Sequence, residues 1–568
     1  MQLLQHFKEL TVRPTNAQEL KGLIMQLAVQ GKLTGDWRTN NPNVNKASIN
    51  LESIKAKKEL QIVQESEIPF KLNSTWEWAK FIDVAELRHG HQFRKYDFVE
   101  EGIPVIKIGQ CKSDGTLDFT KCNYIDSNRK DEFQDDLIFQ GHLLMALTGG
   151  TLGKVTRVDK DYGILVQNYR VGNFFADERV ISLDFLNVIL ESELFQGLVR
   201  ERINQNAQPN IGKDNIEKIV MPIPPLEEQK AIVEVVETLF KEVEQLEQLT
   251  VERISLKEDF VTSALNQLTT NNAKQEWTFL QDHFKTFFNE TTNIKKLRET
   301  ILQLAVQGKL TADWRANNPN IEDASILLKR IQKEKAQLIK DKKIKKEKPF
   351  PPITTDEIPY ELPESWVWCR LGTVSQIGSS KRIYEADYVK QGVPFYRSKE
   401  IGDFSRGNKA KSKLFISNQK YLEISKKFGA PKQGDLLITS VGSIGNTWVA
   451  DDREFYYKDG NITQINRSDY VDTFYTQLFI KSPTFMDEVL GKVSGTAYSA
   501  LTIIKLKSLM FMLPPLEEQK AIVQKVNALM GLCDALEQEV LQSQEHSEQL
   551  MQSCLREVFE GEHKTVEV

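Results

Sequence analysis

The sequence has few of the residues that build metal or redox sites. Cysteine occurs five times and histidine seven times in 568 residues. No two cysteines form a C-x-x-C pair and the histidines show no ligand spacing, which argues against zinc ribbons and redox motifs. An odd number of unpaired cysteines is typical of a reducing compartment, so we expect a cytoplasmic protein.

Long apolar runs are also missing. The N-terminal sequence MQLLQHFKEL has no signal-peptide stretch, and no run approaches the roughly 18 apolar residues of a membrane span. Apolar residues make up 40% of the chain and charged residues 27%, which is typical of a soluble globular protein. The length predicts three or four domains of roughly 150 residues each.

Neither an excess of positive charge nor a catalytic motif is present. The net charge is −5, so any field that attracts nucleic acid must come from local patches. Residues 148–154 (TGGTLGK) resemble a P-loop but lack its first glycine and final Ser/Thr, so a tight turn is the better interpretation. We find no amino-methyltransferase motif, glycine-rich cofactor loop or nuclease carboxylate cluster. We therefore expect a non-catalytic chain that itself binds no cofactor and no metal.

What the sequence does contain is an internal repeat. The stretch at 24–43, IMQLAVQGKLTGDWRTNNPN, returns at 301–320 with 17 of 20 positions identical, and PPLEEQKAIV at 224–233 returns unchanged at 514–523. The segments between these motifs share glycine positions but differ elsewhere. A near-identical framework around different inserts predicts one scaffold that presents two surfaces. Gene duplication followed by drift is the alternative.

A heptad pattern follows each PPLEEQ motif and predicts a helix of about 42 residues, or roughly 60 Å. The expected seam positions are Ile232, Val236, Leu239, Val243, Leu246, Ile522, Val526, Leu529, Cys533, Leu536 and Val540. The two helices can pair with each other as an antiparallel coiled coil, or each can be a seam for another chain. Acidic residues outnumber basic ones ten to four over 226–268 and nine to three over 516–560, which favours a spacer over a surface that lies along phosphates.

Between these helical regions the chain mixes short β-prone runs with helical stretches such as 183–202 and 470–489. We expect an α+β protein in which two similar α/β domains, arranged as a tandem repeat, are separated by the coiled coil. The offset between the repeats grows from 277 to 290, which places 13 additional residues around 331–350. The lysine run at 333–348 is interpreted as a solvated helix end or linker, with a phosphate-binding track as the alternative.

The chain resembles the specificity subunit of type I restriction–modification systems. The resemblance covers essentially the whole chain and is carried by the paired PPLEEQKAIV and QLAVQGKL motifs, the coiled-coil helices and the tryptophans at 76, 78, 366 and 368. It implies two target-recognition domains that each read one half of a split double-stranded DNA sequence. It also implies two modification subunits that carry S-adenosylmethionine and methylate adenine, and restriction (motor/nuclease) subunits that use ATP and Mg²⁺.

The resemblance also implies five regions. They are a conserved N-terminal helical region at 1–66, a first recognition domain at 67–223, and a central conserved region at 224–356 with the coiled-coil helix, repeat helix and lysine-rich linker. A second recognition domain follows at 357–513, and a C-terminal coiled-coil helix at 514–568. A restriction enzyme fused to its own methyltransferase is the first competing interpretation, and the missing motifs oppose it. A scaffold that binds no DNA is the second.

Base reading requires Arg, Lys, Asn, Gln, Ser or Thr on presented loops. The first domain offers Arg88, His91, Gln92, Arg94, Lys95, Lys107, Thr148, Thr151 and Lys154 as DNA-contact candidates. The second offers Ser379, Ser380, Lys381, Arg382, Arg397, Lys399, Ser440, Ser443 and Asn446. The domains differ in charge, with 23 acidic and 18 basic residues over 75–223 but 14 acidic and 21 basic over 365–513. We expect the second domain to supply most of the non-specific DNA affinity.

Overall fold

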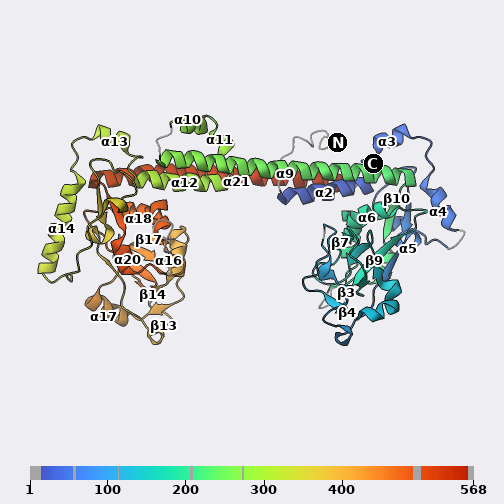
Figure 1. Cartoon of the computed structure of the whole chain (residues 1–568), viewed down its shortest axis with the longest axis horizontal. Coiled ribbons are helices and arrows are strands. Elements are labelled where there is room, and N and C mark those ends of the chain that lie inside the picture. The colour runs from blue at the N-terminus through green and yellow to red at the C-terminus, as the bar shows by residue number, and fades with distance from the viewer. Residues whose placement is uncertain are drawn as a thin grey trace. The chain divides into compact units, whose positions relative to one another are not determined.

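The computed structural model describes residues 14–55, 59–112, 114–204, 209–270, 274–489 and 500–560. The chain divides into two units, residues 1–254 with 546–568 and residues 255–545. Each unit contains one α+β domain and segments of both long helices (Figure 1). Among the described helices, none is both long and apolar enough to cross a bilayer.

The first domain is built from three small sheets. Strands β1 (Glu77–Lys80) and β10 (Val220–Ile223) pair antiparallel and close the two ends of the domain on each other. The central sheet has the order β2-β9-β6-β7, with bounds Ala85–His89, Val171–Ala176, Leu143–Ala146 and Val155–Arg157. The distal sheet has the order β4-β3-β8-β5, with bounds Asn123–Ile125, Ile103–Ile106, Leu165–Gln167 and Leu137–Ile138. Only β3 and β8 pair in parallel among these described strands.

The second domain repeats this topology except at the edges of the distal sheet. Strands β11 (Val367–Arg370) and β20 (Met510–Leu513) form the closing pair. The central sheet, β12-β19-β16-β17, has the bounds Ile377–Gly378, Ile462–Ile465, Leu436–Thr439 and Thr447–Val449. The distal sheet, β13-β15-β14-β18, has the bounds Tyr388–Val389, Phe415–Ile416, Val393–Tyr396 and Tyr456–Tyr457, and β14 pairs in parallel with β18. The expectation of two similar α/β domains in tandem is confirmed.

The repeated helices form as the sequence predicts. Helices α2 (Pro14–Val29) and α12 (Thr291–Val306) each end beside a glycine with positive φ, 68° at Gly31 and 72° at Gly308, a conformation that favours glycine. The helical stretches at 183–202 and 470–489 are each split into two. The resulting pairs are α6 (Leu183–Glu191) with α7 (Glu193–Glu201), and α18 (Thr473–Lys481) with α19 (Pro483–Val489).

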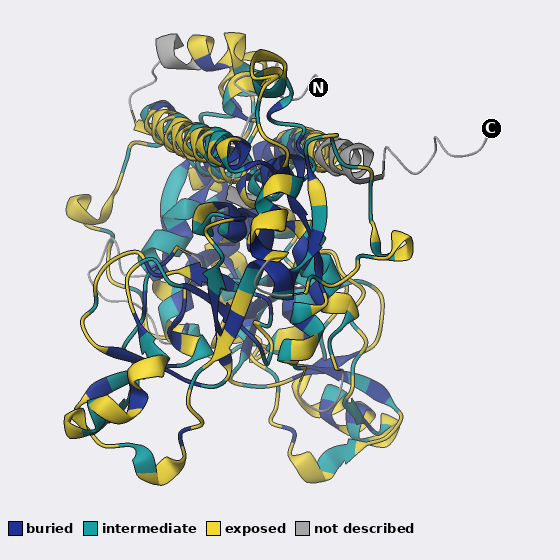
Figure 2. Cartoon of the chain, turned by 90° about the vertical axis from the view of Figure 1, so that its right-hand side faces the viewer, coloured by how far each residue is buried: buried dark blue, intermediate teal, exposed yellow. Residues whose placement is uncertain are grey.

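A serine caps the following helix at each split, and at the second split Pro483 also prevents the preceding helix from continuing. The Ser192 hydroxyl accepts a hydrogen bond from the backbone N–H of Phe195, and the Ser482 hydroxyl accepts one from Phe485. A serine that caps the next helix in this way has extended φ and ψ, which interrupts the preceding helix. Buried residues concentrate in the part of each domain nearest the helices and become sparse toward the distal loops (Figure 2).

The second glutamate of each PPLEEQ motif explains why these motifs recur. The Glu228 carboxylate is fully buried and accepts hydrogen bonds from the Thr34 hydroxyl (2.8 Å), the Arg38 guanidinium (2.5 Å) and the Trp76 indole N–H (2.9 Å). The carboxylate therefore joins the start of the long helix to the repeated QGKLTxDWR segment and to the residue that precedes β1. A buried carboxylate is tolerated because its charge is paired and hydrogen-bonded.

The second PPLEEQ motif forms an equivalent hydrogen-bond network around Glu518. Glu518 accepts from the Thr311 hydroxyl (2.7 Å) and the Trp366 indole (2.8 Å), and it ion-pairs with Arg315. Gln229 and Gln519, the next residues of the motifs, are also buried and bond backbone groups of their own domains. The two PPLEEQ motifs are therefore identical because each one builds the same buried hydrogen-bond network in its own unit.

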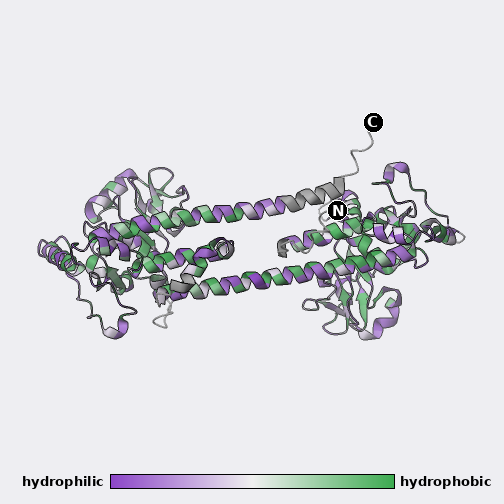
Figure 3. Cartoon of the chain, turned by 90° about the horizontal axis from the view of Figure 1, so that it is seen from above, coloured by the Kyte–Doolittle hydropathy of each residue, from purple (hydrophilic) through white to green (hydrophobic). Residues whose placement is uncertain are grey.

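The long helices are α9 (Leu226–Thr270) and α21 (Leu516–Glu560), 45 residues each. Polar and apolar residues alternate along them (Figure 3). Every predicted seam position is buried or half-buried in the core of its unit. The repeat helices take part in this packing: in the second unit Lys296 of α12 reaches Glu258 of α9 (2.8 Å), while Arg298 reaches Asp534 of α21 (2.5 Å). Helix α12 therefore lies between the end of α9 and α21.

The 13 additional residues of the second repeat begin in a longer helix. Helix α14 (Ala324–Lys340) has 17 residues, whereas its counterpart α4 (Ala47–Lys55) has nine. Lys333 and Lys340 are exposed, and residues 345–349 are exposed and without regular structure. Lys335 is half-buried and donates to the carbonyl of Gly372 at 2.7 Å. This agrees with the interpretation as a helix end and linker.

Candidate nucleic-acid interface

A segment of the second domain, residues 456–463, brings its three predicted contact stretches together. The Ser380 hydroxyl donates to the carbonyl of Tyr457 (2.7 Å), and the backbone N–H of Ser440 donates to the carbonyl of Asn461 (2.8 Å). Three further side chains bind the same segment: Ser379 at Ile462, Ser398 at Asn461 and Arg382 at Asp459. Stretches far apart in the sequence therefore share one anchor.

The first domain has the equivalent anchor at residues 167–170. The backbone N–H of His91 donates to Gln167, and the N–H of Leu147 donates to Arg170 (3.0 and 3.1 Å). Ile106, next to Lys107, accepts from the N–H of Asn168 at 3.0 Å. The predicted stretches around His91, Lys107 and Thr148 thus meet at the β8–β9 connection, as those of the second domain meet at the β18–β19 connection.

Five of the first-domain candidates have side chains that are exposed to solvent. Arg88 lies on β2, pairs with Glu86 at 2.8 Å and stacks on the Phe175 ring at 4.4 Å, with nearly half of its side chain exposed. The others, on the loop after β2, are His91, Gln92, Arg94 and Lys95. Among the described residues Arg94 and Lys95 form no ion pair. Their charges are available to a ligand.

The remaining first-domain candidates have partners inside the protein. The Lys107 ammonium donates to Asn123 (2.6 Å) and lies over the Phe98 ring, and burial lowers the pKa of this lysine. Lys154 donates to the carbonyl of Cys111 at 3.0 Å. Residues 148–154 join the antiparallel strands β6 and β7 and contain Gly153 at φ 88°, which confirms the tight turn. Within it Thr148 is half-buried and Thr151 exposed.

The second-domain candidates divide in the same way. Lys381, Lys399 and Ser443 are exposed, and Arg382 keeps 64% of its side chain exposed while it pairs with Asp459. Ser440 is buried, with its hydroxyl 2.7 Å from that of Thr463. Two half-buried candidates also have neighbours: Arg397 contacts Glu400 at 3.5 Å and Asn446 donates to Ser443 at 3.1 Å. Contact with DNA stays a prediction for all of them.

The central segments contribute residues that the sequence analysis missed. Arg170 is exposed and donates to the Tyr169 hydroxyl at 2.7 Å, and Lys458 is exposed at the corresponding connection of the second domain. Both lie almost 80 residues after the loop that follows β2 or β12, and about 20 residues after the turn that follows β6 or β16. An aligned pair of β-prone runs, ILVQNYRVG and EFYYKDGNI, is the signal that marks them in the sequence.

The loops after β2 and β12 share the same backbone turn but present different side chains to solvent. The Asp97 carboxylate accepts from the backbone N–H of Arg94 (2.7 Å), and Asp387 accepts from that of Tyr384 (3.1 Å), closing the same 3-10 turn. The inward residues, Phe93 and Ile383, are buried in both loops. The outward residues differ: Arg94-Lys95-Tyr96 in the first loop corresponds to Tyr384-Glu385-Ala386 in the second. Tyr96 and Tyr384 are 78% and 64% exposed.

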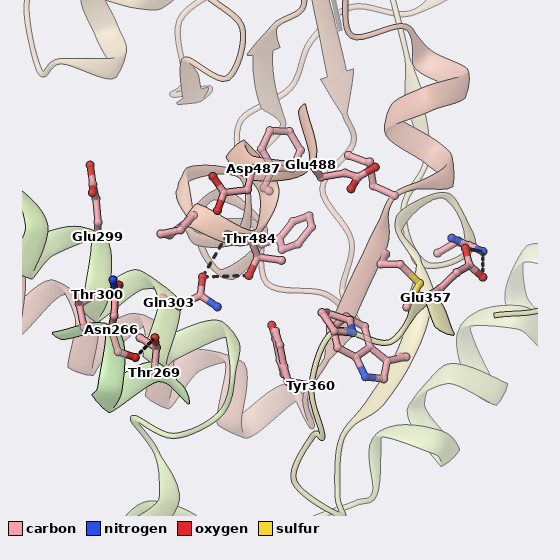
Figure 4. Close-up of a pocket in the computed structure, with 18 of the residues that line it drawn as sticks. Asn266, Thr269, Glu299, Thr300, Gln303, Glu357, Tyr360, Thr484, Asp487 and Glu488 are labelled. Carbon is pink, nitrogen blue, oxygen red and sulfur yellow. Dashed lines mark hydrogen bonds and ion pairs between the residues drawn. The ribbon is translucent and has the colours of Figure 1, made fainter. Parts of the chain in front are cut away.

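A hollow of about 1020 Å³ in the second unit lies between α9, α12 and the closing strands (Figure 4). Gln303 of α12 accepts hydrogen bonds there from the backbone and hydroxyl of Thr484, which docks the repeat helix on α19. Gln26, its equivalent in the first unit, accepts from the N–H of Leu194. This hollow lies on the helical framework and contains none of the predicted DNA contacts.

Comparison with known proteins identifies the family to which this chain belongs. The type I restriction modification DNA specificity domain matches residues 73–253 and again residues 363–545. The chain belongs to that family. It is a type I specificity subunit with two DNA-recognition domains and is itself the non-catalytic component.

Two Escherichia coli relatives match nearly end to end. The EcoAI specificity subunit is 27% identical over 91% of this chain and 90% of its own length. The EcoEI specificity subunit is 26% identical over 93% and 91%. The crystal structure of an HsdS subunit from Thermoanaerobacter tengcongensis aligns at 18% identity with a TM-score of 0.45, covering 87% of this chain and 99% of that one.

Proposed function

We propose that each recognition domain reads one half of a split double-stranded DNA target through the surface gathered around its central segment. The observation that carries this proposal is the doubled loop, in which identical turns present Arg94-Lys95-Tyr96 in one domain and Tyr384-Glu385-Ala386 in the other. Base edges in the major groove differ in their hydrogen-bond donors and acceptors, so different outward side chains select different bases.

The complete assembly, in this proposal, contains two modification subunits and adds restriction subunits when unmodified DNA is cut. S-adenosylmethionine lies on the modification subunits, and ATP and Mg²⁺ on the restriction subunits. The relatives are named as specificity subunits of type I restriction enzymes, and adenine methylation and cleavage are, in this proposal, activities of the partner subunits. The complex works in the cytoplasm, where the DNA to be marked is found.

The long helices act as the spacer between half-sites. Their acidic surfaces are unsuited to phosphates, and their seam residues are committed to the cores of the two units. Whole heptads added or removed after Leu246 and at the matching point of α21 should change the number of bases between the half-sites and leave the half-sites themselves unchanged. An active complex with unaltered spacing would exclude the spacer role.

Methylome sequencing tests the proposal directly. Cells that carry this chain and its cognate modification subunit should acquire one split motif with methylated adenines, and cells with the modification subunit alone should not. Purified complex should bind the same motif with an affinity that falls steeply as salt rises. A continuous motif, or a motif that forms without this chain, would contradict two-half recognition.

A further inference from the structure

One end of the second domain carries lysines around an exposed aromatic ring. Helix α17 (Asn418–Phe428) ends with Lys426, Lys427 and Phe428, all of them exposed. The ammonium of Lys427 lies 5.5 Å from the centre of the Phe428 ring. The ammonium of Lys381, from the loop after β12, lies 5.2 Å from the same ring. The tertiary structure thus brings a predicted contact residue onto α17, which sequence analysis had not singled out.

These positive charges are not neutralised within the protein. Among the described residues Lys381, Lys426 and Lys427 form no ion pair, whereas nearby Lys420 pairs with Asp387 at 3.1 Å. Lysines in a last turn favour the helix dipole, which accounts for Lys426 and Lys427 taken singly. The dipole of α17 does not account for the position of Lys381, which lies in the loop after β12. Helix α17 also carries Glu423, but positive charges that have no ion-pair partner among the described residues attract an anion.

The first domain has the opposite charge at the matching place. Its η5 (Ser127–Asp136) follows β4 as α17 follows β15. It carries four acidic residues, Asp131, Glu132, Asp135 and Asp136, against two basic ones, Arg129 and Lys130. The η5 residue Phe133 packs 5.0 Å from the ring of His91, the residue that corresponds to Lys381. Both domains therefore place this element against the same loop, and only the second makes the junction basic.

We propose that Lys381, Lys426 and Lys427 form a phosphate-binding site of the second domain that grips the DNA backbone, and that the first domain has no counterpart. The inference rests on the proposed function. The Phe428 ring positions Lys381 and Lys427 by cation–π attraction. Contacts to phosphates fix the position of a protein on DNA without reading its bases. The site accordingly supplies affinity and leaves the recognised sequence unchanged.

The double variant K426Q/K427Q, in the assembled methyltransferase, tests this site. Affinity for a duplex that contains the mapped target is measured at several salt concentrations. The plot of log affinity against log salt should flatten by about 0.9 for each lost phosphate contact, and the methylated motif should stay the same. K426R/K427R keeps both charges and should retain the wild-type slope. K295Q/K329Q removes two exposed lysines from helices of the same unit and serves as the matched control.

Three outcomes would overturn the inference: an unchanged slope in K426Q/K427Q, an equal loss in K295Q/K329Q, or a changed methylated motif. The last result would mean that the lysines read bases. Failure of the proposed function looks different, because the wild-type complex would then bind duplex DNA without salt dependence or without preference for a split motif.

Discussion

The two recognition domains share most of one topology and have net charges of opposite sign. Their sheets have matching strand orders apart from one edge strand in each distal sheet, β5 in the first domain and β13 in the second, and their closing strands pair in the same register. Yet the first domain has five more acidic than basic residues over 75–223, and the second has seven more basic than acidic residues over 365–513. Framework and surface have therefore diverged to very different extents in one chain.

The reason is physical. Inward positions such as Phe93 and Ile383 must fill a close-packed core, so they stay apolar, while an outward position can change charge with little effect on folding. Even a buried polar pair can be exchanged as a unit. His142 contacts Asn173 at 2.9 Å in the first domain, and at the corresponding place Asp435 accepts from Gln464 at 2.7 Å.

The largest effect is expected from exchanging residues 76–221 for the same segment of a relative. The closing strands β1 and β10 lie at the ends of this segment, so the new domain should join the framework without disturbing the second domain. Methylome sequencing should show one new half-site and one unchanged half-site. A change in both half-sites would show that the two domains do not read independently.

Next in size is the effect of Glu228→Gln on the stability of the first unit. The variant leaves the Arg38 guanidinium without its buried counter-charge and should cost about 3 kcal/mol. Glu518→Gln should have the same effect on the second unit. Glu227→Gln, at the exposed neighbouring position, is the control and should be close to neutral. Denaturant unfolding of each variant measures the free energy of unfolding. Equal stability of E228Q and E227Q would show that the buried Glu228 network does not stabilise the first unit.

The difference in net charge between the domains predicts a smaller effect, on the salt dependence of DNA binding. Neutralising the exposed residues Lys381, Arg382 and Lys399 should flatten the salt dependence of DNA binding more than neutralising Arg88, Arg94 and Lys95. Both triple variants are compared in the assembled methyltransferase at several salt concentrations. Equal slopes, or a larger loss from the first-domain set, would show that local placement outweighs the net charge of the domain.

The smallest effect concerns pH. Burial, and then the nearby Arg88 guanidinium, lower the pKa of His142 below its ordinary value of 6.5. Below pH 6.5 the unfolded chain therefore takes up a proton before the folded one, so the first unit loses stability as pH falls and the loss levels off below the folded pKa. His142→Gln should remove this part of the pH dependence in unfolding measured between pH 5 and 8. An unchanged profile would contradict the assignment.

Much of the framework could be predicted because local patterns encode it. The PPLEEQ motifs and the glycines after α2 and α12 marked features that the structure contains. The heptad positions from Ile232 to Val540 are buried or half-buried in the cores of the two units, and their role as a coiled-coil seam stays a prediction. The split at Ser192 was not predicted, because a serine cap competes with helix continuation only where the following backbone N–H turns toward it. The split at Ser482 was also missed, although Pro483, which cannot continue the preceding helix, marks it in the sequence.

The sequence by itself determined that this protein is a doubled scaffold with two different surfaces, because repeated motifs and heptad spacing are local properties of the chain. Only the tertiary structure decided which candidate residues are accessible. It placed Lys107, Lys154 and Ser440 in internal hydrogen bonds, and it gathered distant loops around residues 167–170 and 456–463. Such contacts join residues that lie tens of positions apart, and no local pattern carries that information.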